Sequence, residues 1–371
     1  MEKEKTKKIK KWEVYFYVII SIILVVEIFI IVRRQGWLPL WIDKSPSPLI
    51  AQIDPAIREK RADFKIINAH EHIQSLDNIP LILKYMEDCQ IEKMLLLGTP
   101  NYTFYLDLKY GFTGIYENNE EIIKISKEYP DKFIALCSID PFDENKIEKL
   151  KKYIANGAKG LTLWNGHGFF HDHFLDLPLD DPGMMEIYQY CEDEEIPILY
   201  HINSSRPYFE QFEKILKTFP DLIIHAPHFV LTSRNLDFLV RLLDDYPNLY
   251  TDVSFGHPDF QVAGFERISN NSENFQKFVQ KYRDRITFGT DMVITDHQSK
   301  SRIYLDNITL SYFDMLEKEE FTLPSELFSK MRKEVRSRVD PNKVYKGLHL
   351  DDETLRMIYH DNPERIFWKT E

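Results

Sequence analysis

Five residues of this chain combine the side-chain types and the positions that metal chemistry needs. His70 and His72 lie two residues apart in the segment IINAHEHI, so along an extended chain both side chains point to the same side. His201, His228 and Asp291 each lie at the end of, or just after, a short apolar run farther along. Three histidines and one carboxylate are suitable ligands for Zn, Fe, Mn or Co, and they leave one position open for water. We therefore predict one divalent ion, with zinc as the first choice, held by His70, His72, His201 and Asp291.

His228 is left over from this ligand set and suggests a second role. An imidazole beside a bound ion can take a proton from water or polarise a substrate carbonyl. The prediction is therefore that His228 is the acid/base of a reaction, with Asp291 sharing the handling of the proton.

These residues are spread over more than 200 positions, so a regular scaffold must bring them together. Eight short apolar runs alternate with amphipathic, charged stretches, a pattern that predicts parallel strands each followed by a helix. The runs cover residues 64–68, 93–99, 133–139, 159–164, 196–202, 222–227, 249–254 and 286–291. Eight such units favour a closed (β/α)8 TIM barrel, and no GxGxxG motif opens the first unit as a dinucleotide fold would require. In such barrels the active site forms at the carboxyl ends of the strands, where the five residues fall.

Several other residues need a separate interpretation. Lys159 begins the fourth run, about 16 Å below the expected site, so it is not expected to bridge two metals, and one ion is favoured over two. His225 lies three positions before His228 and is expected to pack on the opposite face of its strand. Trp164 and Asn165 follow the fourth run and Arg206 follows the fifth, so these three are the predicted substrate contacts.

The N-terminal part of the chain has a different composition. Residues 14–32 are nineteen mostly apolar residues with Glu27 as the only charge, which is long enough to cross a bilayer as a helix. A basic tail precedes them at 1–13, and a proline-containing linker is expected at 33–61. Six lysines before the span favour a cytoplasmic N-terminus, and the two arginines directly after the span oppose it. The prediction is a single-pass membrane protein whose remaining residues lie outside the cytoplasm.

Composition limits the partners of the predicted barrel, residues 62–371, within which a helical insertion is expected at about 298–350. The net charge of −12 argues against nucleic acid, because phosphate binding needs a basic surface. Three widely spaced cysteines without a CxxC motif predict neither a disulfide framework nor a cysteine zinc site. A small-molecule substrate remains the expected partner, and the oligomeric state is left open.

The motifs resemble those of the amidohydrolase-related family that includes aminocarboxymuconate semialdehyde decarboxylase. The resemblance covers roughly residues 65–368 and depends on the order and spacing of IINAHEHI, GAKGLTLW, DDPGMMEIYQYCEDEEIPILYHIN, FPDLIIHAPHF, RITFGTD and HDNPERIF. It implies a (β/α)8 barrel and either a hydrolase or a nonoxidative decarboxylase, often with one zinc. It also implies the same ligands and the same acid/base: His70, His72, His201 and Asp291 for the metal, and His228 for the proton.

Two departures from the family pattern affect this site. The family usually has aspartate two residues before the first histidine, and Asn68 stands there, which suggests a less basic ligand. The family usually has glycines after the sixth-strand histidine, and Phe229 and Val230 stand there, which suggests a narrower pocket.

Three functions are compatible with these observations. The first is a metal-dependent hydrolase that attacks a C–N or C–O acyl bond. The second is a decarboxylase with the same ligands, which a basic residue in the pocket would favour. The third is a non-catalytic, membrane-bound binding protein, which would be expected to have lost ligands, whereas none is missing here.

Overall fold

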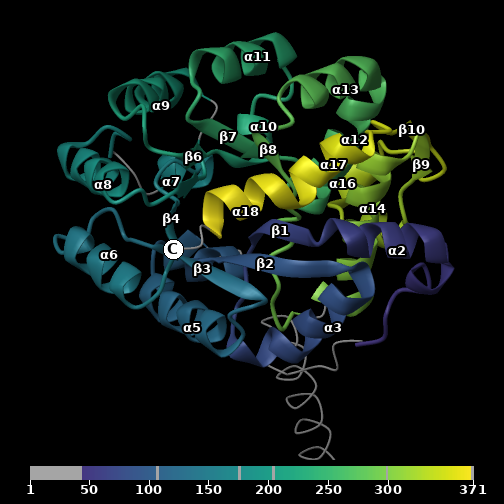
Figure 1. The fold of residues 1–371 in the computed structure, drawn as a ribbon, viewed down its shortest axis with the longest axis horizontal. Coiled ribbons are helices and arrows are strands. Elements are labelled where there is room, and N and C mark those ends of the chain that lie inside the picture. The colour runs from purple at the N-terminus through teal and green to yellow at the C-terminus, as the bar shows by residue number, and fades with distance from the viewer. Residues whose placement is uncertain (1–43, 106–107, 174–176, 203–204, 298–299, 369–371) are drawn as a thin grey trace, which may run out of the picture.

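Eight parallel strands follow one another in sequence order and form the centre of the molecule (Figure 1). The computed structural model describes residues 44–368 except 106–107, 174–176, 203–204 and 298–299. Its central strands are β1 (Ile66–Glu71), β2 (Ile91–Leu97), β3 (Phe133–Ser138), β4 (Gly160–Leu163), β5 (Ile198–Tyr200), β6 (Ile224–His225), β7 (Leu249–Asp252) and β8 (Ile286–Thr287). The amide of Ala69 donates to the carbonyl of Phe288 at 2.8 Å, and Ile73 bridges Ile294 in parallel. These contacts join the last strand to the first, and the predicted TIM barrel is confirmed.

Helices surround the strands on the outside of the barrel (Figure 1). They are α2 (Pro55–Phe64), α3 (Ile79–Cys89), α4 (Asn101–Tyr105), α5 (Ile115–Glu128), α6 (Lys146–Ala155), α7 (Gly168–His173), α8 (Pro182–Asp193), α9 (Arg206–Thr218), α11 (Leu236–Asp245), α12 (Pro258–Asn270), α13 (Ser272–Lys281) and α14 (Arg302–Glu317). The short segment α10 (Pro227–Val230) instead follows the end of β6 and contains His228. Helix α8 shows why the helices form. Asp181 caps its first turn by accepting from the amide of Gly183, and Pro182 occupies the first helical position, where no amide donor is needed. Its buried residues recur every one to four positions, which gives the helix one apolar face against the sheet: Met184, Ile187, Tyr188 and Cys191.

The inside of the barrel is filled with apolar side chains below the strand ends. The buried interior cluster contains Ala69, Leu95, Leu97, Ile134, Leu136 and Leu199. Ile366 and Phe367 of the last helix, α18 (Asn362–Phe367), belong to the same cluster. The C-terminal helix therefore helps to close the barrel, and the polar chemistry is confined to the other end.

The segment predicted as a helical insertion, about 298–350, differs from that expectation. Helix α14 packs against α3, and thirteen of its sixteen residues are buried, so it is part of the barrel wall. After it come a two-stranded antiparallel sheet, β9 (Glu320–Thr322) and β10 (Val344–Lys346), and two short helices, α15 (Ser325–Ser329) and α16 (Lys333–Arg336). The sheet escaped prediction because each strand is only three residues long and the two are separated by more than twenty residues. Helix α17 (Asp352–Arg356) and a π-helical turn (Met357–Asp361) then lead to α18.

Part of the predicted linker 33–61 packs against the barrel. The amide of Ser47 donates to Asp306 Oδ2 at 2.8 Å, and the Ser47 hydroxyl donates to Asn307 Oδ1 at 2.6 Å, both on α14. Helix α2 begins at Pro55, with Asp54 as its cap. Among the described residues no helix is long and apolar enough to cross a membrane, and the predicted span 14–32 lies outside them.

Candidate metal centre

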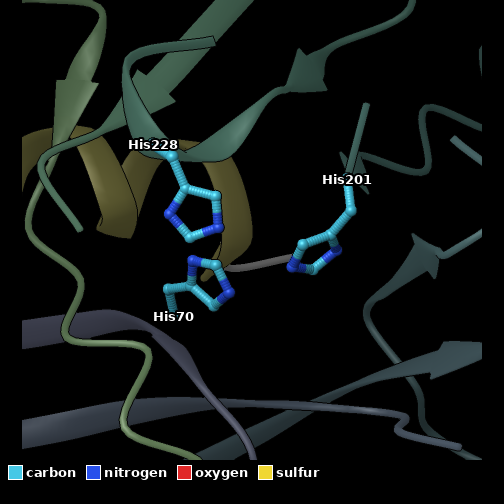
Figure 2. A group of neighbouring side chains, drawn as sticks. All are labelled: His70, His201 and His228. Carbon is cyan, nitrogen blue, oxygen red and sulfur yellow. The ribbon is translucent and has the colours of Figure 1, made fainter. Parts of the chain in front are cut away.

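The carboxyl ends of β1, β5, β6 and β8 bring together the five residues that the sequence singles out. Two overlapping groups place all their ligand atoms within 4.8 Å of one another, one of His70, His201 and His228 and the other of His70, His72 and Asp291. Figure 2 shows the imidazoles of His70, His201 and His228 turned toward one another from three different parts of the ribbon. Chain segments more than 200 residues apart thus meet at one point, as the barrel geometry requires.

The Nδ1 protons of His70 and His72 point away from the cluster, toward hydrogen-bond acceptors. His70 Nδ1 lies 2.7 Å from the carboxylate of Asp252, which can only accept, so this nitrogen carries the proton. His72 Nδ1 lies 2.7 Å from the hydroxyl of Thr99. That hydroxyl already donates to the carbonyl of Leu97 at 2.6 Å, so it accepts from His72. In the neutral rings both Nε2 atoms are therefore left with a lone pair, and they face each other at 3.3 Å.

Asp291 completes this side of the cluster. Its Oδ1 lies 3.2 Å from His72 Nε2 and 3.6 Å from His70 Nε2, and its amide donates to the carbonyl of His70 at 2.9 Å. The residue has a φ of 48°, in the left-handed region that costs a non-glycine residue energy. Gly256 approaches it so closely that an added Cβ would lie 2.7 Å from Asp291 Oδ2.

Glu71, between the two histidines, holds the loop that carries Asp291. Its side chain is fully buried on the other side of the strand. Glu71 Oε1 accepts from the amides of Val293 and Met292, at 2.9 and 3.1 Å, and Oε2 accepts from the hydroxyl of Thr290 at 2.7 Å. Sequence reasoning missed this residue because the alternation of the strand directs it away from the ion.

His228 lies on an unusual turn after β6. Four successive residues, His228 to Leu231, have φ values between 52° and 61°, which makes a short left-handed turn. His228 Nδ1 lies 2.9 Å from Ser254 Oγ and 3.2 Å from the Ser254 carbonyl, so the proton is on Nδ1. The Nε2 lone pair is free and lies 3.5 Å from Asp291 Oδ2.

This turn corrects the expectation that Phe229 and Val230 narrow the pocket. The Phe229 ring is fully buried, and its centroid lies 5.8 to 6.4 Å from those of Phe255, Phe275 and Phe278. It therefore packs within an aromatic cluster. The backbone explains why glycine suits these positions, because only glycine adopts positive φ without a Cβ penalty.

His201 is packed by Trp164. The two rings are stacked 4.4 Å apart with an interplanar angle of 7°, and Trp164 Nε1 donates to the carbonyl of Gly98 at 2.9 Å. Asn165 is also buried, and its Nδ2 donates to the Tyr200 hydroxyl at 3.1 Å. Trp164 thus packs on the ring of His201, and Asn165 contacts Tyr200, the residue before His201. Arg206 begins α9, and its side chain is outside the described residues.

The remaining sequence-based expectations concern three residues near the barrel. Lys159 is exposed at the start of β4, as its position in the run predicts. His225 is buried and lies 2.8 Å from the hydroxyl of Thr287, outside the ligand cluster. Among the described residues, no hydrogen bond joins the Asn68 side chain to an imidazole ring, although its Oδ1 accepts from the backbone amide of His70 at 3.3 Å. The Asn68 side chain bonds Thr290 on the β8 loop, and the carboxylate expected from position 68 is supplied to His70 by Asp252.

Burial and the carboxylates set the charges of the site. Burial opposes a charged His70, but Asp291 and Asp252 outweigh it and raise the pKa of His70 to about 8. Burial lowers the pKa of His72 and places that of His201 well below the usual value. Burial would raise the pKa of Asp291, but His70 and the other imidazoles lower it, so Asp291 is ionised.

These donors fit a divalent cation. Two imidazole lone pairs and a carboxylate oxygen face one another within 3.6 Å, and this arrangement is repulsive unless a proton or a cation lies among them. The raised pKa of His70 shows that the site attracts positive charge. Carboxylate and hydroxyl partners on the outer ring nitrogens are the usual support of metal-binding histidines. The cluster is therefore consistent with a divalent metal site.

The fold and this cluster define a TIM-barrel protein with a buried histidine–aspartate site. The model of a family described as amidohydrolase matches residues 85–368, and the chain belongs to this amidohydrolase family. The match begins after His70 and His72, so these two residues join the site through the geometry described above. No curated protein matches the chain.

Two solved structures are similar to this chain in fold. An uncharacterised TIM-barrel protein from Bordetella bronchiseptica is 16% identical, with a TM-score of 0.52 over 87% of this chain and 95% of that one. A probable 2-pyrone-4,6-dicarboxylic acid hydrolase from Acinetobacter baumannii, solved with citric acid bound, is 15% identical, with a TM-score of 0.53 over 82% of this chain and 100% of that one. At these identities the likeness shows the fold alone.

Proposed function

We propose that this protein is a hydrolase that uses one divalent ion, zinc in the first instance, to cleave a C–N or C–O acyl bond of a small molecule. The ligands in this proposal are His70, His72, His201 and Asp291. The supporting observation is that the Asp291 carboxylate lies between the proposed metal ligands of β1 and the proposed base His228. Its Oδ1 faces the Nε2 atoms of His70 and His72, and its Oδ2 lies 3.5 Å from Nε2 of His228.

The chemistry divides between the ion and the chain. A divalent ion in such a site polarises a carbonyl and lowers the pKa of water toward neutrality. His228 is the base, because its Nδ1 proton is held by Ser254 and its Nε2 lone pair is free. Burial lowers the pKa of His228, which keeps it unprotonated at neutral pH. Once it has taken the proton of the attacking water, His228 returns it to the leaving group, and Asp291 stabilises the imidazolium.

The test measures metal and turnover separately on the full-length protein. We expect His70→Ala and Asp291→Ala to lose most of the bound zinc. We expect His228→Gln to keep the zinc and to lose about 100- to 10,000-fold in the hydrolysis of a panel of acyl amides, esters and lactones. Full zinc occupancy in both ligand variants would contradict the ligand assignment, and full activity of His228→Gln would contradict the role of the base.

A decarboxylase with the same ligands is the second candidate, and one observation favours it. The ammonium group of Lys300 donates to the carbonyl of Met292, the residue after Asp291, so a cation is present beside the site. A cation there suits a substrate that carries a carboxylate. Release of CO2 from a panel of aromatic and unsaturated carboxylates, without acyl hydrolysis, would establish this alternative in place of the first.

We also propose that residues 14–32 anchor the protein in a membrane, with the barrel outside the cytoplasm. The support is the length and apolar composition of this stretch and the excess of lysine before it. A reporter fused after Glu371 tests the orientation, since enzymes such as alkaline phosphatase fold only outside the cytoplasm. Activity of a cytoplasm-specific reporter at the same position would reverse the proposed orientation, and extraction of the protein by alkaline carbonate would contradict the anchor.

A further inference from the structure

Lys300 places a positive charge beside the carboxylate end of the site. It lies just before α14, and its ammonium group donates to the carbonyl of Met292 and lies 5.2 Å from the centre of the Tyr304 ring. Burial lowers the pKa of Lys300 to about 8, while Glu71 and Asp291 are near enough to raise it in part. The ammonium group is partly buried, so part of its hydration has been removed.

Two buried arginines have acidic partners. Arg302, which is fully buried, pairs with Asp306 at 2.6 Å and Asp88 at 2.7 Å. Arg61 pairs with Glu317 at 2.8 Å. Such pairing is expected, because a buried cation without a counter-charge is costly.

Two cations in the segment after α14 also have acidic partners. Lys330 pairs with Glu326 at 3.1 Å, and Arg332 pairs with the buried carboxylate of Asp259. The positive charge of Lys330 lowers the pKa of Lys300. Lys300 and Arg332 together lower the pKa of His257, so these cations act on the same region. Among the described residues, no carboxylate lies within 4.0 Å of the Lys300 ammonium. Within the described part of the chain, Lys300 therefore lacks the acidic partner that these four neighbouring or buried cations have.

We propose that Lys300 binds an anionic group of the substrate, a carboxylate or an equivalent oxyanion, while the reacting group of the same molecule occupies the metal centre. This inference rests on the metal site of the proposed function and applies equally to hydrolysis and decarboxylation. Lys300 is positioned for this task because its bond to the carbonyl of Met292 fixes the ammonium next to the loop of Asp291. The substrate then supplies the missing counter-charge, and a charge-assisted hydrogen bond forms where water has been partly excluded.

The test uses two matched series of metal-binding probes on the zinc-loaded, full-length protein. The first series consists of monohydroxamates of linear dicarboxylic acids with one to four methylene groups, and the second has a methyl group in place of the free carboxylate. The hydroxamate binds the metal in both series, so only the far end of the probe differs. Isothermal titration calorimetry at neutral pH measures both affinities. At the best chain length, we expect the carboxylate probe to bind about 10- to 100-fold more tightly than its methyl counterpart.

Three variants locate the preference. Lys300→Met, which keeps the length of the side chain without its charge, should remove the preference and leave the affinity for the methyl probe unchanged. Lys300→Arg should keep part of the preference. Lys330→Met is the matched control, because Lys330 already has an acidic partner, and it should keep the full preference.

The outcomes distinguish this inference from the proposed function. Equal binding of the two series by the wild-type protein, or a preference that persists in Lys300→Met, would overturn the role of Lys300 and leave the metal site intact. Failure of the protein to hold zinc, or of both series to bind, would overturn the proposed function and this inference with it.

Discussion

Replacing Asp252 by asparagine tests whether the outer carboxylate sets the tautomer of a metal ligand. Asp252 Oδ1 accepts from the Ser254 hydroxyl at 2.6 Å and from the amides of His228 and Ser254 at 2.9 and 3.0 Å, whereas Oδ2 accepts from His70 alone. An asparagine keeps most bonds by placing its oxygen toward the three donors, so its NH2 faces His70 Nδ1. Because two N–H groups cannot pair, His70 must move its proton to Nε2, where it occupies the lone pair needed for the ion.

The expected loss of zinc affinity has a definite magnitude, and it should be measured at a pH where protons do not compete with the metal. Loss of such an outer partner weakens metal binding about 10- to 100-fold, or about 1.4 to 2.7 kcal/mol. A second effect has the opposite sign, because Asp252 also raises the pKa of His70 and so helps a proton to compete with the metal. The measurement is therefore made at about pH 9, above the pKa of His70, where this competition disappears.

Zinc affinity is measured by competition with a chromophoric chelator, and thermal unfolding of the same samples is followed by circular dichroism. Glu317→Gln is the matched control, since this carboxylate accepts from Arg61 and Tyr359 away from the metal centre. We expect the control to unfold at a lower temperature with unchanged zinc affinity. An Asp252→Asn protein that binds zinc as tightly as the wild type at about pH 9 would refute the tautomer argument.

Three further predictions follow from the same geometry. Metal affinity should rise with pH and level off above about 8, with nearly one proton released per bound ion at neutral pH. The reason is that protonation of His70, whose pKa is raised, stabilises the metal-free protein fully below about pH 6.5, and this stabilisation is lost as pH rises through about 8. Calorimetry in buffers of different ionisation enthalpy measures the number of protons released. Glu71→Gln should lower metal affinity about tenfold and change the visible spectrum of the cobalt-substituted protein, because the loop of Asp291 loses acceptors for its amides; an unchanged spectrum would contradict this. Leu231→Asn should stabilise the protein by about 1 kcal/mol in urea unfolding, because Leu231 is 42% exposed and asparagine tolerates its φ of 53°, whereas Leu231→Ala should give no gain.

Periodicity was sufficient to predict the barrel. Each of the eight runs contains or overlaps an observed strand, because a strand buried on both faces must be apolar along its length. The β9–β10 sheet could not be predicted in the same way. Its strands pair Glu320–Thr322 with Val344–Lys346, and neither is long enough to show an alternation that distinguishes it from a loop.

The extent of the ordered chain before the barrel also depended on contacts between distant residues. Ser47 is held by Asp306 and Asn307, about 260 positions away, and no local pattern around Ser47 indicates this. A proline-containing stretch has the composition of a linker, but its side chains can still be buried against a helix that is distant in the sequence.

The sequence by itself determined which residues form the candidate site. A barrel of parallel strands carries its chemistry at the carboxyl ends, so His70, His72, His201, His228 and Asp291 could be selected from their places in the runs. Their types fixed the chemistry, since imidazole and carboxylate groups at one point suit a divalent cation.

Only the tertiary structure decided how these residues are held and what else lies beside them. Asp252, Glu71 and Lys300 sit in strands or loops where nothing local distinguishes them from ordinary charged residues. Asp252 and Glu71 have partners on other strands or loops, His70 for Asp252 and the loop of Asp291 for Glu71, whereas Lys300 is turned back onto that same loop. The physical reason is that a hydrogen bond depends on distance and direction between atoms in space, and for residues far apart in the chain these are set by the closed barrel.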